Sequence, residues 1–373
     1  MQESELRYYL GLYFATGVGA RRLINIREYF KDAERAFRAP ANELSRVPGI
    51  GGTTAASLVE QREAGLENAD KQISMLRDDQ QIVTFFDDLY PDQLRSIYDP
   101  PALLYVQGDV TLLAPERAIA VIGSRKVTDY GKRIAHAFSE GLVRERVTIV
   151  SGFARGVDTI AHRSAVEAGG KTIAVLGSGI DVIYPAGNKQ FAQELVSSGA
   201  GVIVSELQLG TPPDARNFPW RNRIVSGLSH GVLVIESDEK GGSMITASLA
   251  LDQNREIFAI PGDLGRSMSA GTNMLIRESR AKLVRSAGDL LSDMGWIVRD
   301  RPQRAKQREV RTDLSLFENR IVSVLETAAE PLQIDVLSER SEIEVQDMLV
   351  HLLQLEFKSV VRQLAGKQFM LVD

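Results

Sequence analysis

Six short apolar runs between residues 118 and 263 restrict the folds open to this chain. They read AIAVIGSR (118–125), TIVSGFARG (148–156), KTIAVLGSG (171–179), GVIVSEL (201–207), GVLVIES (231–237) and EIFAIPGD (256–263). A strand that is apolar without alternation has both faces covered, as in a parallel sheet between two layers of helices. The runs therefore predict an α/β fold built on a Rossmann-like, doubly wound parallel sheet.

The endings of these runs indicate where a ligand binds. In open parallel sheets, ligands bind outside the carboxyl ends of the strands. The residues at those ends are Ser, Arg, Asn, Gly and Glu, and the chain contains no cysteine. This set favours anion binding over thiolate chemistry or a thiolate metal site.

The length of 373 residues predicts two or three domains. We expect a helical domain over 1–75, a connector over 76–109, a Rossmann-like domain over 110–298, a linker over 299–312 and a winged helix over 313–373. The N-terminus is polar and no apolar run approaches the length of a membrane span, which predicts a cytoplasmic protein with no membrane partner.

The N-terminal segment contains two glycine turns 32 residues apart, Gly17-Val18-Gly19 and Pro48-Gly49-Ile50-Gly51-Gly52. Each lies between an apolar helix and a new helix start. This layout is similar to tandem helix-hairpin-helix motifs, whose backbone N–H groups can hold a DNA phosphate. The alternative is a glycine-capped helical bundle that only packs or bridges proteins.

The C-terminal segment reads as helices near 314–328, 332–339 and 343–356, followed by a hairpin with its turn at Ala365-Gly366-Lys367. This order predicts a winged helix. Its third helix carries Glu344, Asp347 and Glu356 and no Lys or Arg, whereas a DNA-reading helix needs cations. A protein-interaction role is therefore favoured over DNA reading.

The first strand ending, Gly123-Ser124-Arg125-Lys126, combines a glycine turn, a helix N-terminus and a guanidinium. It lacks the three glycines of dinucleotide-binding turns, so we predict no NAD, no FAD and no other cofactor. The second ending places Arg155 between two glycines. Asp158 and His162 follow four residues apart on one helical face. They could form a metal pair, an acid–base pair or a structural clamp that holds the loop. The clamp is favoured, and we predict no metal site and no catalytic residue.

The segment Phe218-Pro219-Trp220-Arg221-Asn222-Arg223 suits phosphate contacts beside base stacking, unless both aromatic rings are buried in the core. A further glycine loop at Gly242 and Ser243 begins another helix. The complete predicted binding set is Gly123, Ser124, Arg125, Lys126, Ser151, Gly152, Phe153, Arg155, Gly156, Gly177, Gly179, Lys189, Phe218, Arg221, Asn222, Arg223, Gly242 and Ser243.

These motifs, in order from GSR (123–125) through SGFARGVDTIAH (151–162), LGSGIDVIYPAGN (176–188), FPWRNRIVSGLS (218–229), GGSMITA (241–247) and IPG (260–262), resemble the DNA-processing protein A (DprA/Smf) family. The resemblance implies a protein that binds single-stranded DNA, dimerises through its Rossmann-like domain and loads a RecA-type recombinase in natural transformation, with no established catalytic activity. The family's arginines correspond to Arg125, Arg155, Arg221 and Arg223.

Two departures stand out. Ala186 replaces a residue that is often basic in the family, which leaves Lys189 to supply that charge, and Ser279-Arg280-Ala281 replaces a glycine-alanine pair.

We therefore predict a non-enzymatic mediator of recombination whose four arginines bind phosphates. At roughly 0.7 per contact, four contacts predict a log–log salt slope near −3. The alternatives are a structural or signalling adaptor and an enzyme acting on a nucleoside monophosphate. The enzyme would use Glu206 or Glu236 as an acid, although the loop Lys240–Thr246 lacks the glutamate of such enzymes.

Overall fold

The structure is a computed structural model that describes residues 3–15, 18–297, 314–328, 331–358, 360–364 and 368–371. Gly17 of the first predicted turn, the predicted linker 299–312 and the predicted hairpin turn 365–367 lie outside these residues. The chain divides into two compact units, Met1–Arg299 and Asp300–Asp373, and each is described by itself. Among the described residues, no helix is both long and apolar enough to cross a bilayer.

The predicted helical N-terminus is confirmed. It consists of α1 (Glu3–Phe14), α2 (Ala20–Phe30), α3 (Ala33–Arg38), α4 (Ala41–Leu44) and α5 (Gly52–Ser74). Gly19 and Gly51 precede α2 and α5 as N-cap residues without a side-chain cap. The helices enclose a core of their own around Tyr9, Leu23 and Phe37. Whether these turns work as helix-hairpin-helix motifs stays a prediction.

A nine-stranded sheet forms the centre of the first unit, in the order β1-β2-β6-β5-β4-β3-β7-β8-β9. The six apolar runs form β3 (Ala118–Ile122), β4 (Thr148–Ser151), β5 (Thr172–Val175), β6 (Gly201–Ser205), β7 (Gly231–Val234) and β8 (Glu256–Ala259). All six are parallel, which confirms the predicted doubly wound sheet.

Three further strands complete the sheet. The segment predicted as a connector contributes β1 (Gln80–Thr84) and β2 (Leu103–Gln107), and β2 pairs with β6 in the antiparallel sense. The two-residue β9 (Lys282–Leu283) pairs with β8 at the opposite edge. The sheet is thus mixed, because an antiparallel pair extends the predicted parallel core.

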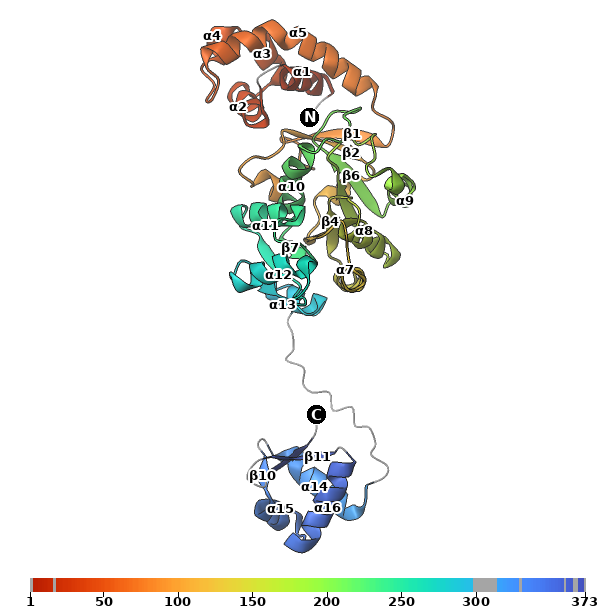
Figure 1. Cartoon of the computed structure of the whole chain (residues 1–373). Helices are drawn as coiled ribbons and strands as arrows, with labels where there is room; N and C mark the ends of the chain where they lie inside the picture. The colour runs from red at the N-terminus through yellow and green to blue at the C-terminus, as the bar shows by residue number, and fades with distance from the viewer. Residues whose placement is uncertain are drawn as a thin grey trace. The chain divides into compact units, whose positions relative to one another are not determined.

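Helices cover both faces of the sheet, and Figure 1 shows α10 and α11 on one side of the strands and α7 and α8 on the other. They are α6 (Asp92–Arg95), α7 (Asp129–Arg144), α8 (Val157–Glu167), α9 (Lys189–Ser197), α10 (Asn217–Gly227), α11 (Gly242–Asp252), α12 (Ser267–Arg277) and α13 (Ala287–Asp293), with 3₁₀ turns at Val110–Leu113 and Ala186–Asn188. Consecutive residues of β3 pack into separate hydrophobic cores. Ala120 lies in the core that includes α10 and α11, and Val121 lies in the core that includes α7 and α8.

The second unit is a winged helix, as predicted. It consists of α14 (Leu316–Thr327), α15 (Ile334–Ser341) and α16 (Val345–Phe357) with a sheet ordered β10-β12-β11. The strands are β10 (Leu332–Gln333), β11 (Val361–Leu364) and β12 (Gln368–Leu371), and β10 was not predicted. Ser315 and Glu318 form a capping box at the start of α14. Ile321, Leu337 and Leu352 lie in the core.

Candidate functional site

A large cavity lies at the carboxyl edge of the sheet. From β3 the chain winds through β4 and β5 to β6, and then returns to β7 on the other side of β3. This reversal of strand order opens a crevice between the ends of β3 and β7, where ligands bind in folds of this kind. The cavity there has a volume of about 750 Å³, and its lining includes residues 122–126, 237–238, 241–243 and 245–246 and the first turns of α10.

The loop after β3 is held by Glu236, at the end of β7. Ser124 N donates to the Glu236 carbonyl (2.8 Å), and Thr128 N donates to the Glu236 carboxylate (2.9 Å). Thr128 in turn caps α7, because its Oγ1 accepts from Gly131 N (3.1 Å). Arg125 and Lys126 are therefore exposed on a loop whose backbone is anchored at both ends.

The loop after β4 packs directly against the loop after β3. Val157 N donates to the Ser124 carbonyl (3.2 Å). Gly156 has φ +83°, and a Cβ on it would clash with the Ser124 carbonyl oxygen, so only glycine fits there without strain. This contact brings the exposed Arg155 beside Arg125, and both line a second cavity of about 290 Å³.

An aromatic cluster joins the two cavities. The Arg125 guanidinium lies 5.2 Å from the ring centroid of Phe218, and Tyr184 lies 5.6 Å from the same ring. Gly177 lets Phe218 approach, since a Cβ there would lie 2.8 Å from the ring. Both cavities share six lining residues: Arg125, Lys126, Gly152, Ala154, Tyr184 and Phe218. We call the two adjoining cavities the strand-end groove.

Arg221 lies in the floor of this groove and is not an exposed cation. Only 5% of it is exposed, and its Nη1 donates to the carbonyls of Gly152 (2.5 Å) and Val175. Burial, together with the charge of Arg125, lowers the pKa of Arg221 to about 10, although the charge of Asp158 opposes this shift. Its neighbour Asn222, which also lines the groove, accepts from Arg221 Nε (3.3 Å).

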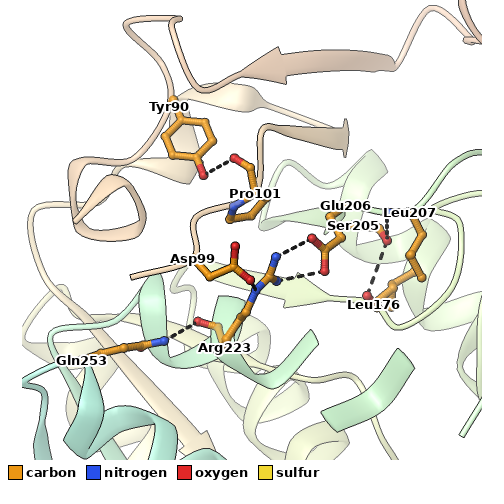
Figure 2. Close-up of polar contacts among 9 residues, drawn as sticks. All are labelled: Tyr90, Asp99, Pro101, Leu176, Ser205, Glu206, Leu207, Arg223 and Gln253. Atoms are coloured by element: carbon orange, nitrogen blue, oxygen red, sulfur yellow. Dashed lines mark hydrogen bonds and ion pairs between the residues drawn. The ribbon is translucent and has the colours of Figure 1, made fainter. Parts of the chain in front are cut away.

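The structure places Arg223 outside the groove, against the prediction that it shares one phosphate track with Arg125. Figure 2 shows its guanidinium directed at Glu206, with Nη1–Oε1 and Nη2–Oε2 distances of 2.9 and 2.6 Å. Asp99 lies 3.6 Å from its Nε, and Trp220 stacks on it at 4.4 Å. Burial against two carboxylates makes Arg223 a structural cation. Trp220 is 52% exposed, so the alternative that both aromatics are buried does not hold.

Asp158 hydrogen-bonds to the backbone of the second loop, whereas His162 hydrogen-bonds to β5. Asp158 accepts from Ala154 N (3.3 Å), whereas His162 Nδ1 lies 2.6 Å from Thr172 Oγ1. Burial raises the pKa of Asp158, and burial with the nearby Arg221 charge lowers that of His162 to about 3. Their spacing allows a mutual hydrogen bond, and the described contacts give each a different partner. No cluster of three metal-ligating side chains occurs within the described part of the chain.

Several predicted residues do not line the groove. Phe153 is fully buried and stacks on Phe191 at 5.8 Å, so its ring belongs to the core rather than to a DNA-binding surface. Ser151 donates to the Val121 carbonyl (2.7 Å) inside the sheet. Neither cavity is lined by Gly156, Gly179, Lys189 or His162, and Lys189 begins α9 as an exposed residue.

Other predicted residues do converge on the groove. Gly123, Ser124, Gly152 and Gly177 come from the strand ends, and Gly242 and Ser243 open α11, where Ser243 Oγ donates to Ser237 Oγ (2.7 Å). Sequence reasoning missed Tyr184 and Ser237 as lining residues. The available signal was their place in the segments that follow β5 and β7, at the carboxyl edge.

The exposed cations of the groove have no acidic partners within the described part of the chain. None of the ion pairs among the described residues involves Arg125, Lys126 or Arg155. Glu206 is paired with Arg223, and Glu236 accepts from Thr128. Three free cations beside aromatic rings can hold an anionic chain and stack its flat groups.

Comparisons with known proteins find relatives for both units of the chain. The family model for DNA recombination-mediator protein A matches residues 81–295, and that for the DprA winged helix domain matches residues 306–367. Protein Smf of Escherichia coli is 38% identical over 284 residues, which covers 75% of this chain and 74% of that protein.

Two solved structures are similar. The DNA processing protein A of Streptococcus pneumoniae has a TM-score of 0.68 at 34% identity, covering 77% of this chain and 97% of that one. The DNA processing protein A of Helicobacter pylori, whose structure concerns its single-stranded DNA binding mode, has a TM-score of 0.52 at 33% identity and covers 57% of this chain and 95% of that one.

Proposed function

The chain belongs to the DNA recombination-mediator protein A (DprA/Smf) family, and on that premise we propose that it binds single-stranded DNA along the strand-end groove. One observation carries the proposal: Arg125, Lys126 and Arg155 are exposed and enter no ion pair among the described residues, and they line adjoining cavities that also hold Phe218 and Tyr184. Cations spread along a groove suit a polymer of phosphates better than one small ligand.

Each part of the groove has a separate task in binding. The three exposed cations attract the backbone without reading sequence. Phe218 and Tyr184 offer ring faces for bases, and such stacking is worth roughly 1–3 kcal/mol per base. The N-terminus of α11, with Gly242 and Ser243, supplies amide donors for a further phosphate. A duplex keeps its bases stacked inside, so it gains only the backbone contacts.

Fluorescence anisotropy with a labelled mixed-sequence single strand tests the proposal. With three exposed cations in place of the four arginines predicted from sequence, the log–log salt slope is expected near −2. Arg125→Ala weakens binding to mixed and homopolymer strands by about the same factor, whereas Arg277→Ala, which removes an exposed arginine that lines neither cavity, leaves it unchanged. A log–log salt slope near zero would contradict the proposal.

We further propose that the chain acts in recombination and transformation as a cytoplasmic homodimer that loads a RecA-type recombinase. The support is the family's description as a recombination mediator. Recombinase ATP hydrolysis on a single strand already covered by a single-strand-binding protein should begin sooner when the chain is present. Arg125→Ala should remove that effect, and sedimentation velocity reports the oligomeric state.

We propose no catalytic role for the groove. The acids that a nucleoside-monophosphate enzyme would need, Glu206 and Glu236, are held by Arg223 and Thr128. Incubation with AMP should release no adenine. Detection of free base at a rate proportional to protein concentration would establish the enzyme alternative instead.

A further inference from the structure

The winged-helix unit exposes an apolar stripe along α16. Leu349, Leu353 and Phe357 are 53%, 54% and 83% exposed, and Val345 and Val350 are also exposed. Spacings of three and four residues place these five side chains on one side of the helix; we call them the α16 stripe. The opposite side of the helix, through Met348, Leu352 and Leu355, fills the core of the unit.

The stripe lies on the third helix of the winged helix, which in DNA-reading members of the fold enters the major groove. Here the helix has no Lys or Arg. Asp347 borders the stripe three residues before Val350, and Glu356 borders it three residues after Leu353. Glu344 precedes its first residue. Carboxylates around an apolar strip repel a phosphate backbone and an anionic lipid surface alike.

A second copy of this helix is also a poor partner for the stripe. A parallel pair would set Asp347 and Glu356 each against its own equivalent. An antiparallel pair would set Asp347 of one copy against Glu356 of the other. Both arrangements bring like charges together at the border of the contact, and such juxtapositions oppose association.

We infer that the α16 stripe is a docking site for a protein partner that presents an amphipathic helix, with an apolar seam bordered by Lys or Arg. The apolar seam would cover Leu349, Leu353 and Phe357, and the cations would pair with Asp347 and Glu356. Burial of large apolar side chains supplies most of the affinity in helix-in-groove recognition, and the charges select the partner. This site goes beyond the proposed DNA-binding function, because it lies in the other unit of the chain.

The test uses the full chain and two labelled synthetic helical peptides of about three heptads each. One peptide has leucine at a and d with lysine at e and g, and the other replaces lysine by glutamate. Anisotropy should show saturable binding of the lysine peptide and at least tenfold weaker binding of the glutamate peptide. The double variant Leu349→Ser, Leu353→Ser should weaken binding of the lysine peptide at least tenfold.

Two variants keep the test specific. Leu264→Ser removes a leucine that is 93% exposed in the other unit and should leave peptide binding unchanged. The double variant Asp347→Lys, Glu356→Lys should reverse the preference between the two peptides. Circular dichroism establishes that each variant keeps its helix content, because every replaced side chain is at the surface.

Three results would overturn the inference. The first is equal binding of the lysine peptide to the native chain and to the Leu349→Ser, Leu353→Ser variant. The second is equal affinity of the native chain for both peptides. The third is a native oligomer that the same double variant converts to monomer, which would assign the stripe to a second copy. Loss of single-stranded DNA binding by Arg125→Ala, by contrast, bears only on the groove.

Discussion

Arg125 and Arg223 carry the same charge on neighbouring elements, but the protein uses them in opposite ways. Arg125 is exposed beside Phe218 and has no acidic partner among the described ion pairs, whereas Arg223 is buried and doubly hydrogen-bonded to Glu206. A free surface cation contributes little to folding and is available to a ligand. A buried cation that neutralises a buried carboxylate contributes to the stability of the fold instead.

This difference predicts opposite effects of two substitutions. Arg223→Ala leaves Glu206 buried without its counter-charge and should lower the free energy of unfolding by about 3–5 kcal/mol, measured by urea denaturation. Arg125→Ala should change that free energy by less than about 0.5 kcal/mol and should lose DNA affinity. Equal urea midpoints for the native chain and Arg223→Ala would contradict the assignment.

We expect the protein to lose stability in mild acid, because His162 is buried in its neutral form. Its pKa is lowered from 6.5 to about 3, first by burial and then by the charge of Arg221. Between these pH values only the unfolded chain binds a proton at this residue, so its contribution to stability is complete above pH 6.5 and is lost as the pH falls toward 3. From pH 7 to 5, the free energy of unfolding should fall by about 2 kcal/mol on this account.

The His162→Gln variant isolates this contribution. Its overall stability differs because the contact with Thr172 Oγ1 changes, but its loss between pH 7 and 5 should be smaller than that of the native chain by about the same 2 kcal/mol. Parallel pH dependences for the two proteins would show that His162 does not stay neutral in the folded chain.

The sequence predicts which residues follow the strands, but it does not predict where each side chain points. The sequence correctly places Arg125 and Arg155 at strand ends, because a glycine turn directly after an apolar run fixes their position. It does not reveal that Phe153 turns into the core or that Arg221 enters the floor of the groove. Those outcomes depend on Phe191 and on the carbonyls of Gly152 and Val175, which only the tertiary fold brings near.

At the scale of elements, strands that are buried on both faces are the easiest to predict. All six continuous apolar runs form strands, since burial on two faces leaves no alternation. The segment QQIVT was not predicted as β1, because its glutamines suit many structures. Its pairing with β2, which places it at an edge of the sheet, depends on the tertiary fold. The two residues of β9 are too few to carry a pattern.

The contact between the first two strand-end loops gives a prediction for the element scale. Gly156→Ala puts a Cβ into the Ser124 carbonyl at φ +83°, whereas Gly169→Ala faces open space at φ +75°. In both variants the positive φ destabilises the folded chain by about 1–2 kcal/mol. Only Gly156→Ala must also displace the loop that carries Arg125, so only it should lower single-stranded DNA affinity, by at least tenfold. Similar anisotropy curves for the two variants would argue against this role of the loop contact.

At the scale of the whole molecule, the separation into two units predicts that DNA binding survives removal of the winged helix. A variant ending at residue 298 should keep the affinity of the full chain within about threefold, because the whole groove lies in Met1–Arg299. A variant ending at residue 313 retains the basic segment 299–312. Tighter binding by that longer variant would show that this segment contacts the strand, and a large loss in both would place part of the site in the winged helix.

The pairing of β2 with β6 also sets an order of events on the ribosome. About 90 residues separate the two strands in sequence, which at 5–20 residues per second is a delay of about 5–20 seconds. During that time β1 covers one side of β2, and the other side, where residues 105–107 later pair with β6, has no partner strand. An interrupted chain that stops before residue 201 keeps that edge open, and an open apolar edge recruits strands from other molecules. Incomplete products of this length should therefore aggregate, whereas chains that have passed β6 should stay dispersed.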